Sequence, residues 1–167
     1  MRKALYILAD LQDRDIIWLS RNGTQRDLHA GEVLIAAGRE VTELYFVTDG
    51  SFAVDAGGHR IATLALGDAV GEMSFVEKRL PGASVTALEP ARVLAVPRDV
   101  ILAEFERDSG FAARFYRALA VFLSDRLRSA TAQDGAGDEL DETVLDSLHL
   151  AGDRFVRLVA LLEGREQ

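Results

Sequence analysis

The sequence predicts an α+β fold in which helical segments flank a body of antiparallel β-strands. Between residues 24 and 97 the chain breaks into short runs of strand-forming residues separated by turn signals. This spacing is typical of a β-sandwich, roll or barrel and not of a parallel α/β sheet. Before residue 23 and after residue 97, apolar residues instead recur every three or four positions, which is the period of amphipathic helices.

We expect one or two short helices over residues 1–22. Asp13 is expected to cap the second helix, and Trp18 is expected to be buried on its inner face. The apolar positions that predict these helices are Leu5, Leu8, Leu11, Ile16, Ile17 and Leu19.

Short strands are expected over residues 23–97, each ending at a glycine or proline turn. Asp49-Gly50 is a strong turn signal, and Gly57-Gly58 predicts a hairpin. Glu89-Pro90 separates the last two runs. After a first run that ends at residues 28–31, the expected strands are residues 32–35, 43–48, 51–55, 59–65, 83–88 and 92–96.

Two helices are expected over residues 98–132. Asp108-Ser109-Gly110 interrupts the first and is expected to cap the second. The apolar face of the second helix is wider than a single helix–helix contact needs. One side of it can therefore pack on the β-strands while the other meets a partner helix or the tail. Its apolar residues are Phe111, Phe115, Leu119, Phe122, Leu123 and Leu127.

Negative charge is concentrated at the C-terminal end of the chain. The formal net charge is −8, of which residues 1–132 carry −2 and residues 133–167 carry −6. We expect residues 133–139 to form a linker and residues 140–167 an acidic helical tail, either as a solvated face or as a docking tail for a basic partner. The apolar stripe of the tail is Leu140, Val144, Leu148, Ala151, Phe155, Val159 and Leu162.

Composition excludes several classes of protein. With no cysteine there is no disulfide framework, thiolate metal site or cysteine nucleophile. No apolar run is long enough to span a membrane, and the N-terminal apolar stretch is too short for a secretory signal, so we expect a cytoplasmic protein that does not bind membranes. The acidic balance argues against a general nucleic-acid binder.

No pattern in the chain indicates catalysis. The histidines, His29, His59 and His149, are too far apart in the sequence for the clustered metal site of a cupin-like dioxygenase. The G-x-S-x-G pattern of a serine nucleophile is also absent. We therefore expect no enzymatic activity, no metal and no cofactor.

The most informative segment for function runs from Gly67 to Phe75 and continues from Leu80 to Val85. If Glu72 begins a helical turn, the free N–H groups of that turn form a natural anion site, and the Glu72 carboxylate could accept hydrogen bonds from a sugar hydroxyl. The alternative is a glycine-rich turn between strands, with Glu72 serving as a helix N-terminal charge.

An ordered set of residues around this segment resembles the cyclic-nucleotide-binding domain of the catabolite-activator (Crp/Fnr) type, over roughly residues 5–132. The resemblance implies an eight-stranded antiparallel, jelly-roll-like β-roll at residues 23–97, between N-terminal helices at residues 1–22 and C-terminal helices at residues 98–132. The residues that carry it are Gly31, Gly38, Tyr45, Val47, Gly50, Gly67, Gly71, Glu72 and Pro81 to Val85.

The resemblance also implies a binding site for a cyclic nucleotide. Residues Gly71 to Val85 correspond to the family's phosphate-binding cassette, and Glu72 corresponds to the glutamate that binds the ribose 2′-hydroxyl. The end of the long helix, with Arg128, Ala130 and Thr131, lies where the family covers the base; the alternative for Thr131 is an ordinary exposed helix residue. The candidate ligand-binding residues are Gly71, Glu72, Met73, Ser74, Arg79, Gly82, Ala83, Ser84 and Thr131.

One position departs from the family pattern. Gly82 stands where the family usually places an arginine that pairs with the cyclic phosphate. A charge-assisted hydrogen bond contributes about 1.5–3 kcal/mol, so its loss weakens binding by about one to two decades. Arg79, with Lys78, is a candidate substitute, and Ser74 and Ser84 offer neutral hydrogen bonds.

Three interpretations of the cassette stay open. It binds a cyclic mononucleotide weakly, it binds another ligand such as a cyclic dinucleotide, or it is a ligand-free structural module. The first makes the chain a regulatory sensor for a cAMP- or cGMP-like nucleotide that signals by repositioning its helices. The last makes it a dimerisation or docking module.

The expected output is a protein contact and not DNA. Only 35 residues follow residue 132, and their charge of −6 does not suit a DNA-reading helix. By the resemblance, a homodimer through the helix at residues 111–127 is one expected contact. The alternative is that the acidic tail covers the same stripe and keeps the chain monomeric.

Overall fold

The computed structural model describes residues 10–77, 79–131 and 153–164. Its helices are α2 (Asp13–Asn22), α3 (Glu72–Val76), α4 (Arg98–Arg107) and α5 (Ser109–Thr131), with a C-terminal helix at residues 153–162. Its strands are β1 (Thr24–Leu28), β2 (Val33–Ile35), β3 (Glu43–Asp49), β4 (Phe52–Ala56), β5 (His59–Leu64), β6 (Ala69–Val70), β7 (Ser84–Ala87) and β8 (Ala91–Pro97). The expected linker at residues 133–139 and the first part of the expected tail lie outside the described residues.

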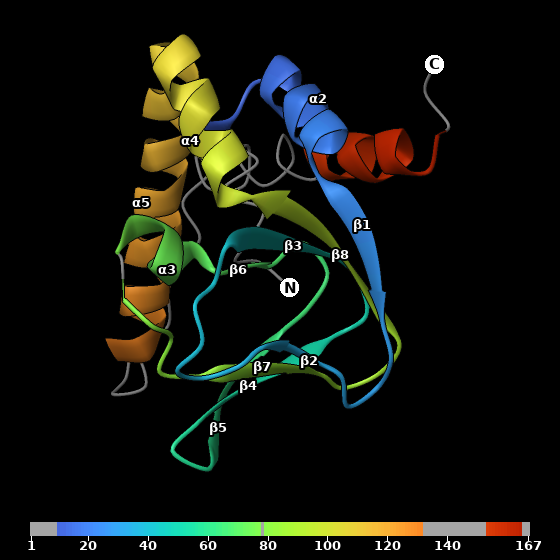
Figure 1. The fold of residues 1–167 in the computed structure, drawn as a ribbon, viewed down its shortest axis with the longest axis vertical. Coiled ribbons are helices and arrows are strands. Elements are labelled where there is room, and N and C mark those ends of the chain that lie inside the picture. The colour runs from blue at the N-terminus through green and yellow to red at the C-terminus, as the bar shows by residue number, and fades with distance from the viewer. Residues whose placement is uncertain (1–9, 78, 132–152, 165–167) are drawn as a thin grey trace. The chain divides into compact units, whose positions relative to one another are not determined.

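The strands form two four-stranded antiparallel sheets, which confirms the predicted β-roll flanked by helices (Figure 1). One sheet has the order β1-β8-β3-β6, and the other has the order β2-β7-β4-β5. Strands β7 and β8 follow each other in the chain but pair in different sheets, so Glu89-Pro90 turns the chain from one sheet to the other. The two-residue strand β6, which pairs with β3, was not predicted.

Apolar side chains from both sheets fill the interior of the roll. In β7 the buried residues Val85 and Ala87 alternate with the less buried Ser84 and Thr86, as expected for a strand with one face on a core. Full burial of one large apolar side chain contributes about 1.5–3 kcal/mol. The interior cluster comprises Leu28, Leu34, Ile35, Val41, Tyr45, Val47, Phe52, Val54, Leu64, Val70, Val85, Ala87, Ala91, Val93 and Ala95.

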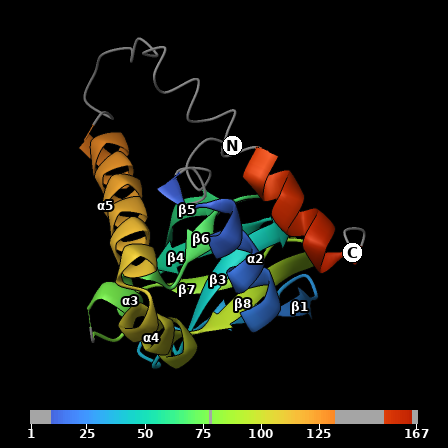
Figure 2. The ribbon, with the colours of Figure 1, turned by 90° about the horizontal axis from the view of Figure 1, so that it is seen from above.

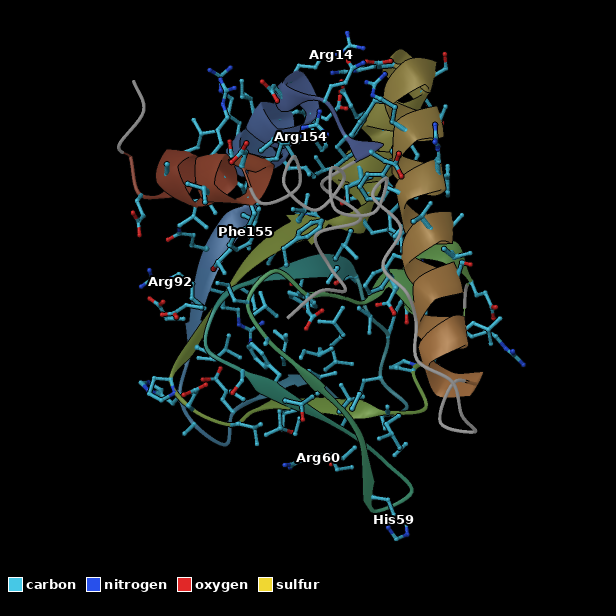
Figure 3. The ribbon with its side chains drawn as sticks, turned by 180° about the vertical axis from the view of Figure 1, so that it is seen from behind. Arg14, His59, Arg60, Arg92, Arg154 and Phe155 are labelled. Atoms are coloured by element: carbon cyan, nitrogen blue, oxygen red, sulfur yellow. The ribbon has the colours of Figure 1, made fainter. Side chains whose placement is uncertain are left out.

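The hairpin predicted at Gly57-Gly58 is confirmed. Both glycines have positive φ (58° and 80°), and Ala56 pairs with His59 across the turn. A two-residue turn of this kind requires positive φ at both positions, which glycine adopts without strain. His59 and Arg60 lie at the tip of this hairpin (Figure 3), and His59 is exposed. Among the described residues, no cluster of three or more histidine, aspartate or glutamate side chains could hold a metal ion.

Residues 19–103 form one compact unit, and the helical residues before 19 and after 103 form a second. In the second unit, the prediction that Asp13 caps α2 is wrong. Asp13 is the first residue of the helix, and Asp15 instead accepts a hydrogen bond from the Gln12 N–H at 2.8 Å. Trp18 is half-buried, with its ring 5.2 Å from that of Phe111.

The predicted cap of α5 is confirmed. The Asp108 Oδ1 atom accepts a hydrogen bond from the Phe111 N–H at 2.9 Å. This bond, with smaller contributions from Arg14 and Arg114, lowers the pKa of Asp108. Arg114 also forms two parallel hydrogen bonds with Asp15, of 2.7 and 2.8 Å, which join α2 to α5.

Most of the apolar stripe predicted on α5 is buried within the chain. Phe111, Phe115, Leu119 and Phe122 are at most 3% exposed, whereas Leu127 is 67% exposed. The apolar surface available for a partner is therefore smaller than the sequence pattern suggests. Homodimerisation through this helix stays a prediction.

The described part of the tail is a helix that lies alongside α2 (Figure 2). Phe155 and Leu158 are buried, and the Arg157 guanidinium donates to the Asp13 carboxylate at 2.7 Å. Arg154, labelled with Phe155 in Figure 3, lies 3.6 Å from the same carboxylate. Within the described ranges, no helix is both long enough and apolar enough to cross a membrane.

Candidate ligand-binding site

Helix α3 begins directly after Gly71, the first residue of the predicted cassette. Gly71 is its N-cap residue, with φ 95° and ψ −2°, and the Gly71 carbonyl accepts a hydrogen bond from the Phe75 N–H at 3.0 Å. The left-handed backbone at Gly71 directs the chain from β6 into a five-residue helix. The helical turn predicted from Glu72 is confirmed.

The first three residues of α3 differ in exposure. Glu72 is 2% exposed and takes part in at least one interaction within the chain. Ser74 is 7% exposed, whereas Met73, which lies between Glu72 and Ser74 in the sequence, is 56% exposed. A buried carboxylate is costly unless it is hydrogen-bonded or paired, so the position of Glu72 is tightly determined.

The second half of the cassette is more open. The Arg79 side chain is 84% exposed, and its guanidinium lies 3.5 Å from the Glu77 carboxylate. Gly82 is exposed, its φ lies outside the left-handed region, and a Cβ atom built there would meet no heavy atom within 4 Å. The position that the family gives to arginine therefore has room for a side chain.

Ala83 and Ser84 face opposite sides of the cassette end. Ala83 packs against the interior cluster of the roll. The Ser84 hydroxyl instead accepts a hydrogen bond from the Ala37 N–H at 3.0 Å, and the Pro81 carbonyl accepts one from Gly38 at 2.8 Å. These two bonds fasten the cassette end to the loop that follows β2.

Thr131 is the last residue of α5, and its side chain lies outside what the structure describes. It belongs to the helical unit, whereas the cassette belongs to the β-roll unit. The predicted role of Thr131 at a base edge stays a prediction.

A pocket of about 230 Å³ adjoins α3 and brings together two of the predicted residues, Ser74 and Arg79. Its lining does not include Gly71, Glu72, Gly82, Ala83 or Ser84. The complete lining is Glu40, Val41, Ser74, Arg79, Leu80 and Arg98.

Arg98 was missed by sequence reasoning. It is the first residue of α4, and its guanidinium carbon lies 5.9 Å from the centre of the Phe75 ring on α3. An arginine over an aromatic face at this distance is a cation–π contact. The contact joins the cassette helix to the start of α4. No spacing pattern in the sequence relates residues 75 and 98.

A partly buried polar pair on β3, Tyr45 and Glu43, lies near Gly71. The Tyr45 hydroxyl donates a hydrogen bond to the Glu43 carboxylate at 3.0 Å. Burial, followed by this hydrogen bond, raises the pKa of Tyr45 to about 12. The hydroxyl therefore stays a proton donor at neutral pH.

Replacing Gly71 with alanine is expected to destabilise the roll. A Cβ atom at this position would lie 2.8 Å from the Glu43 backbone oxygen, at a φ that alanine adopts with strain. We expect a loss of about 1–3 kcal/mol in the free energy of unfolding, measured by urea denaturation. Gly31→Ala is the matched control, because Gly31 has φ 84° but open space around it. Equal losses for both variants would contradict a steric role for Gly71.

A short helix that starts at a left-handed glycine is inserted between strands β6 and β7 of the antiparallel β-roll. The family model for the cyclic nucleotide-binding domain matches residues 25–108. The chain belongs to the cyclic nucleotide-binding domain family.

The chain also matches part of several longer curated proteins. The chain is 34% identical over 129 residues to Glutaminase 2 of Bradyrhizobium diazoefficiens, a match that covers 76% of this chain and 20% of that protein. It spans about a fifth of the length of the first curated relatives it matches.

Two solved structures share the fold. A cyclic nucleotide-binding domain from Methylobacillus flagellatus has a TM-score of 0.72 at 18% identity, over 83% of this chain and 85% of that one. The Thermus thermophilus catabolite activator protein has a TM-score of 0.64 at 21% identity, over 96% and 87%. The predicted resemblance to the catabolite-activator type is confirmed at the level of fold.

Proposed function

We propose that this chain is a regulatory module that binds a cyclic nucleotide, cAMP- or cGMP-like, at residues 71–84 and signals through a protein contact and not through DNA or catalysis. The observation that carries the proposal is the placement of Glu72. It is a nearly fully buried carboxylate in the first turn of α3, directly after the left-handed Gly71, in a domain of this family. A carboxylate held there is suited to accept hydrogen bonds from a ribose hydroxyl.

The signal is proposed to pass from the cassette to α4. Phe75 and Arg98 form a direct contact between the two helices, and the Arg98 N–H donates to the Thr42 carbonyl at 2.9 Å at the start of α4. A ligand that moves α3 changes this contact, so the direction of α4 responds to occupancy. The difference in ligand affinity between the two arrangements sets the size of the response.

Calorimetric titration of the full chain with cyclic AMP, cyclic GMP and cyclic di-GMP tests binding. We expect saturable heat for a cyclic mononucleotide. Absence of heat and of any thermal shift for all three ligands at millimolar concentration would contradict the proposal for these ligands.

Replacing Glu72 with glutamine is expected to weaken binding of a cyclic mononucleotide by about tenfold or more, because a charge-assisted hydrogen bond becomes a neutral one. The side-chain shape is preserved, and thermal denaturation checks that the variant is folded. Glu89→Gln is the matched control, because Glu89 is an exposed carboxylate in the turn between β7 and β8, outside residues 71–84 and outside the pocket lining. An unchanged affinity in Glu72→Gln would exclude Glu72 as a ribose ligand.

One observation favours a second candidate function, a docking module that binds no cyclic mononucleotide. Gly82 supplies no cation where the family usually has arginine, and the nearby Arg79 is almost fully exposed beside Glu77. In that case the domain acts through its surface alone, or through a different ligand such as a cyclic dinucleotide. The three-ligand titration distinguishes these possibilities.

A further inference from the structure

The pocket beside α3 is built from three separate segments of the β-roll unit. Glu40 and Val41 come from the chain before β3, Ser74 and Arg79 come from the cassette, and Arg98 is the first residue of α4. A second hollow of about 500 Å³ adjoins it and shares Glu40, Val41 and Arg98. Arg98 thus lines both spaces.

The Arg98 guanidinium is held in place but has unused hydrogen-bonding capacity. Its guanidinium carbon lies over the Phe75 ring, 5.9 Å from the ring centre, and its Nε atom is shielded from solvent without a hydrogen-bond acceptor in the described part of the chain. No carboxylate among the described residues forms an ion pair with it. A guanidinium carries several N–H donors, and leaving donors unsatisfied is costly. An acceptor supplied from outside the chain would relieve this cost.

The other polar groups of the lining favour a negatively charged ligand. Arg79 adds a second guanidinium, and its pairing with Glu77 at 3.5 Å on an exposed surface is weak enough to exchange. The Ser74 hydroxyl belongs to a residue that is 7% exposed. Glu40 is the one carboxylate in the lining, and it is exposed. The lining thus holds two guanidinium groups and one carboxylate, and Glu77, which is outside the lining, pairs with Arg79.

We propose that this pocket is a phosphate-binding site, with Arg98 as the principal ligand and Arg79 closing over the bound group. Arginine binds phosphate oxygens through two parallel hydrogen bonds, which suits a guanidinium fixed on an aromatic ring. At about 230 Å³ the pocket is smaller than the roughly 300–1,000 Å³ of sites for drug-sized ligands. It therefore takes a phosphate group and not a whole nucleotide.

The phosphate has two possible sources, a free phosphate anion or the phosphate of a bound nucleotide. With the nucleotide as source, the inference rests on the proposed function, and Arg98 replaces the cation that Gly82 lacks. With the free anion as source, the site is independent of Glu72, which does not line the pocket. Guanidinium N–H donors bind phosphate oxygens in either case.

The test is an NMR titration of the full chain with sodium phosphate at constant pH and ionic strength, followed at the Arg98 Nε–Hε and Ser74 amide signals. We expect saturable shifts at both signals. Arg98→Gln is expected to weaken phosphate binding by about tenfold or more and Arg79→Ala by a smaller factor. Arg60→Ala is the matched control, because Arg60 is an exposed arginine on the β4–β5 hairpin, and it is expected to bind as the parent chain does.

Arg98→Lys is the second variant, in case Arg98→Gln does not fold. Lysine keeps the positive charge but lacks the planar pair of N–H donors of a guanidinium, so we expect weaker phosphate binding. Absence of saturable shifts up to tens of millimolar phosphate, or equal affinity in the parent chain and the folded Arg98 variants, overturns the site.

Two further titrations identify the source of the phosphate. If a cyclic mononucleotide shifts the Arg98 Nε–Hε signal and phosphate competes with it, the bound group is the phosphate of the nucleotide. If only phosphate shifts the signal, and still does so in Glu72→Gln, the site takes the free anion. If the chain binds phosphate but no cyclic mononucleotide, the proposed function is contradicted and the phosphate site is supported. If the chain binds a cyclic mononucleotide but phosphate does not shift the Arg98 and Ser74 signals, only the phosphate site is contradicted.

Discussion

Replacing Gly82 with arginine is expected to tighten binding of a cyclic mononucleotide by about ten- to a hundredfold. The new guanidinium supplies the charge-assisted hydrogen bonds that the family usually makes to the cyclic phosphate. The structure accepts the change, because Gly82 is exposed, its φ lies outside the left-handed region, and no heavy atom lies within 4 Å of the added Cβ atom. Calorimetry with cyclic AMP and cyclic GMP measures the gain.

Gly82→Ala is the control for this substitution. It adds the same Cβ atom and the same backbone restriction without a cation, so we expect little change in nucleotide affinity. If Gly82→Arg binds no more tightly than Gly82→Ala, then either the ligand is not a cyclic mononucleotide or its phosphate lies away from residue 82. The second outcome directs attention to Arg98 and the pocket beside α3.

Much of the β-roll could be predicted because its signals are local. Gly57-Gly58 between two strand-forming runs favours a two-residue hairpin, and alternation in β7 follows from one buried face. Strand β6 is only two residues long, so it has no pattern of its own and exists because β3 offers partners at Tyr45 and Phe46. Asp13 was predicted as the cap of α2 but is the first residue of the helix, and the carboxylate that accepts a hydrogen bond from the Gln12 N–H belongs to Asp15. The sequence alone does not distinguish these two aspartates.

The candidate site shows the same division between local and distant interactions. Gly71 and Glu72 became candidates through the ordered set of residues that resembles the family, and the helical turn predicted from Glu72 is a local feature that the structure confirms. Arg98 could not be predicted, because its contact with Phe75 depends on how the end of β8 meets the cassette. The hydrogen bond that the Ser84 hydroxyl accepts from the Ala37 N–H also depends on the pairing of β7 with β2.

Replacing Arg114 with alanine is expected to cost about 3 kcal/mol in the free energy of unfolding, at the lower end of the range for breaking a buried ion pair. The two hydrogen bonds of Arg114 to Asp15 join residues 99 positions apart, and the Asp15 side chain is only 3% exposed. Without Arg114 the Asp15 carboxylate stays buried but loses its ion pair and two of its hydrogen bonds. The Gln12 N–H, which still donates to Asp15 at 2.8 Å, limits the loss. The midpoint of thermal unfolding should fall by roughly 6–12 °C.

Arg117→Ala is the control on the same helix. Its guanidinium lies 3.6 Å from the Asp10 carboxylate and its side chain is 76% exposed, so the pair is screened by solvent. We expect a loss below about 1 kcal/mol for this variant. A double-mutant cycle with Asp15→Ala separates the pairing from the burial of charge, because Asp15→Ala removes the carboxylate that Arg114→Ala leaves unpaired. If Arg114→Ala is no more destabilising than Arg117→Ala, the Asp15–Arg114 pair does not hold α2 to α5.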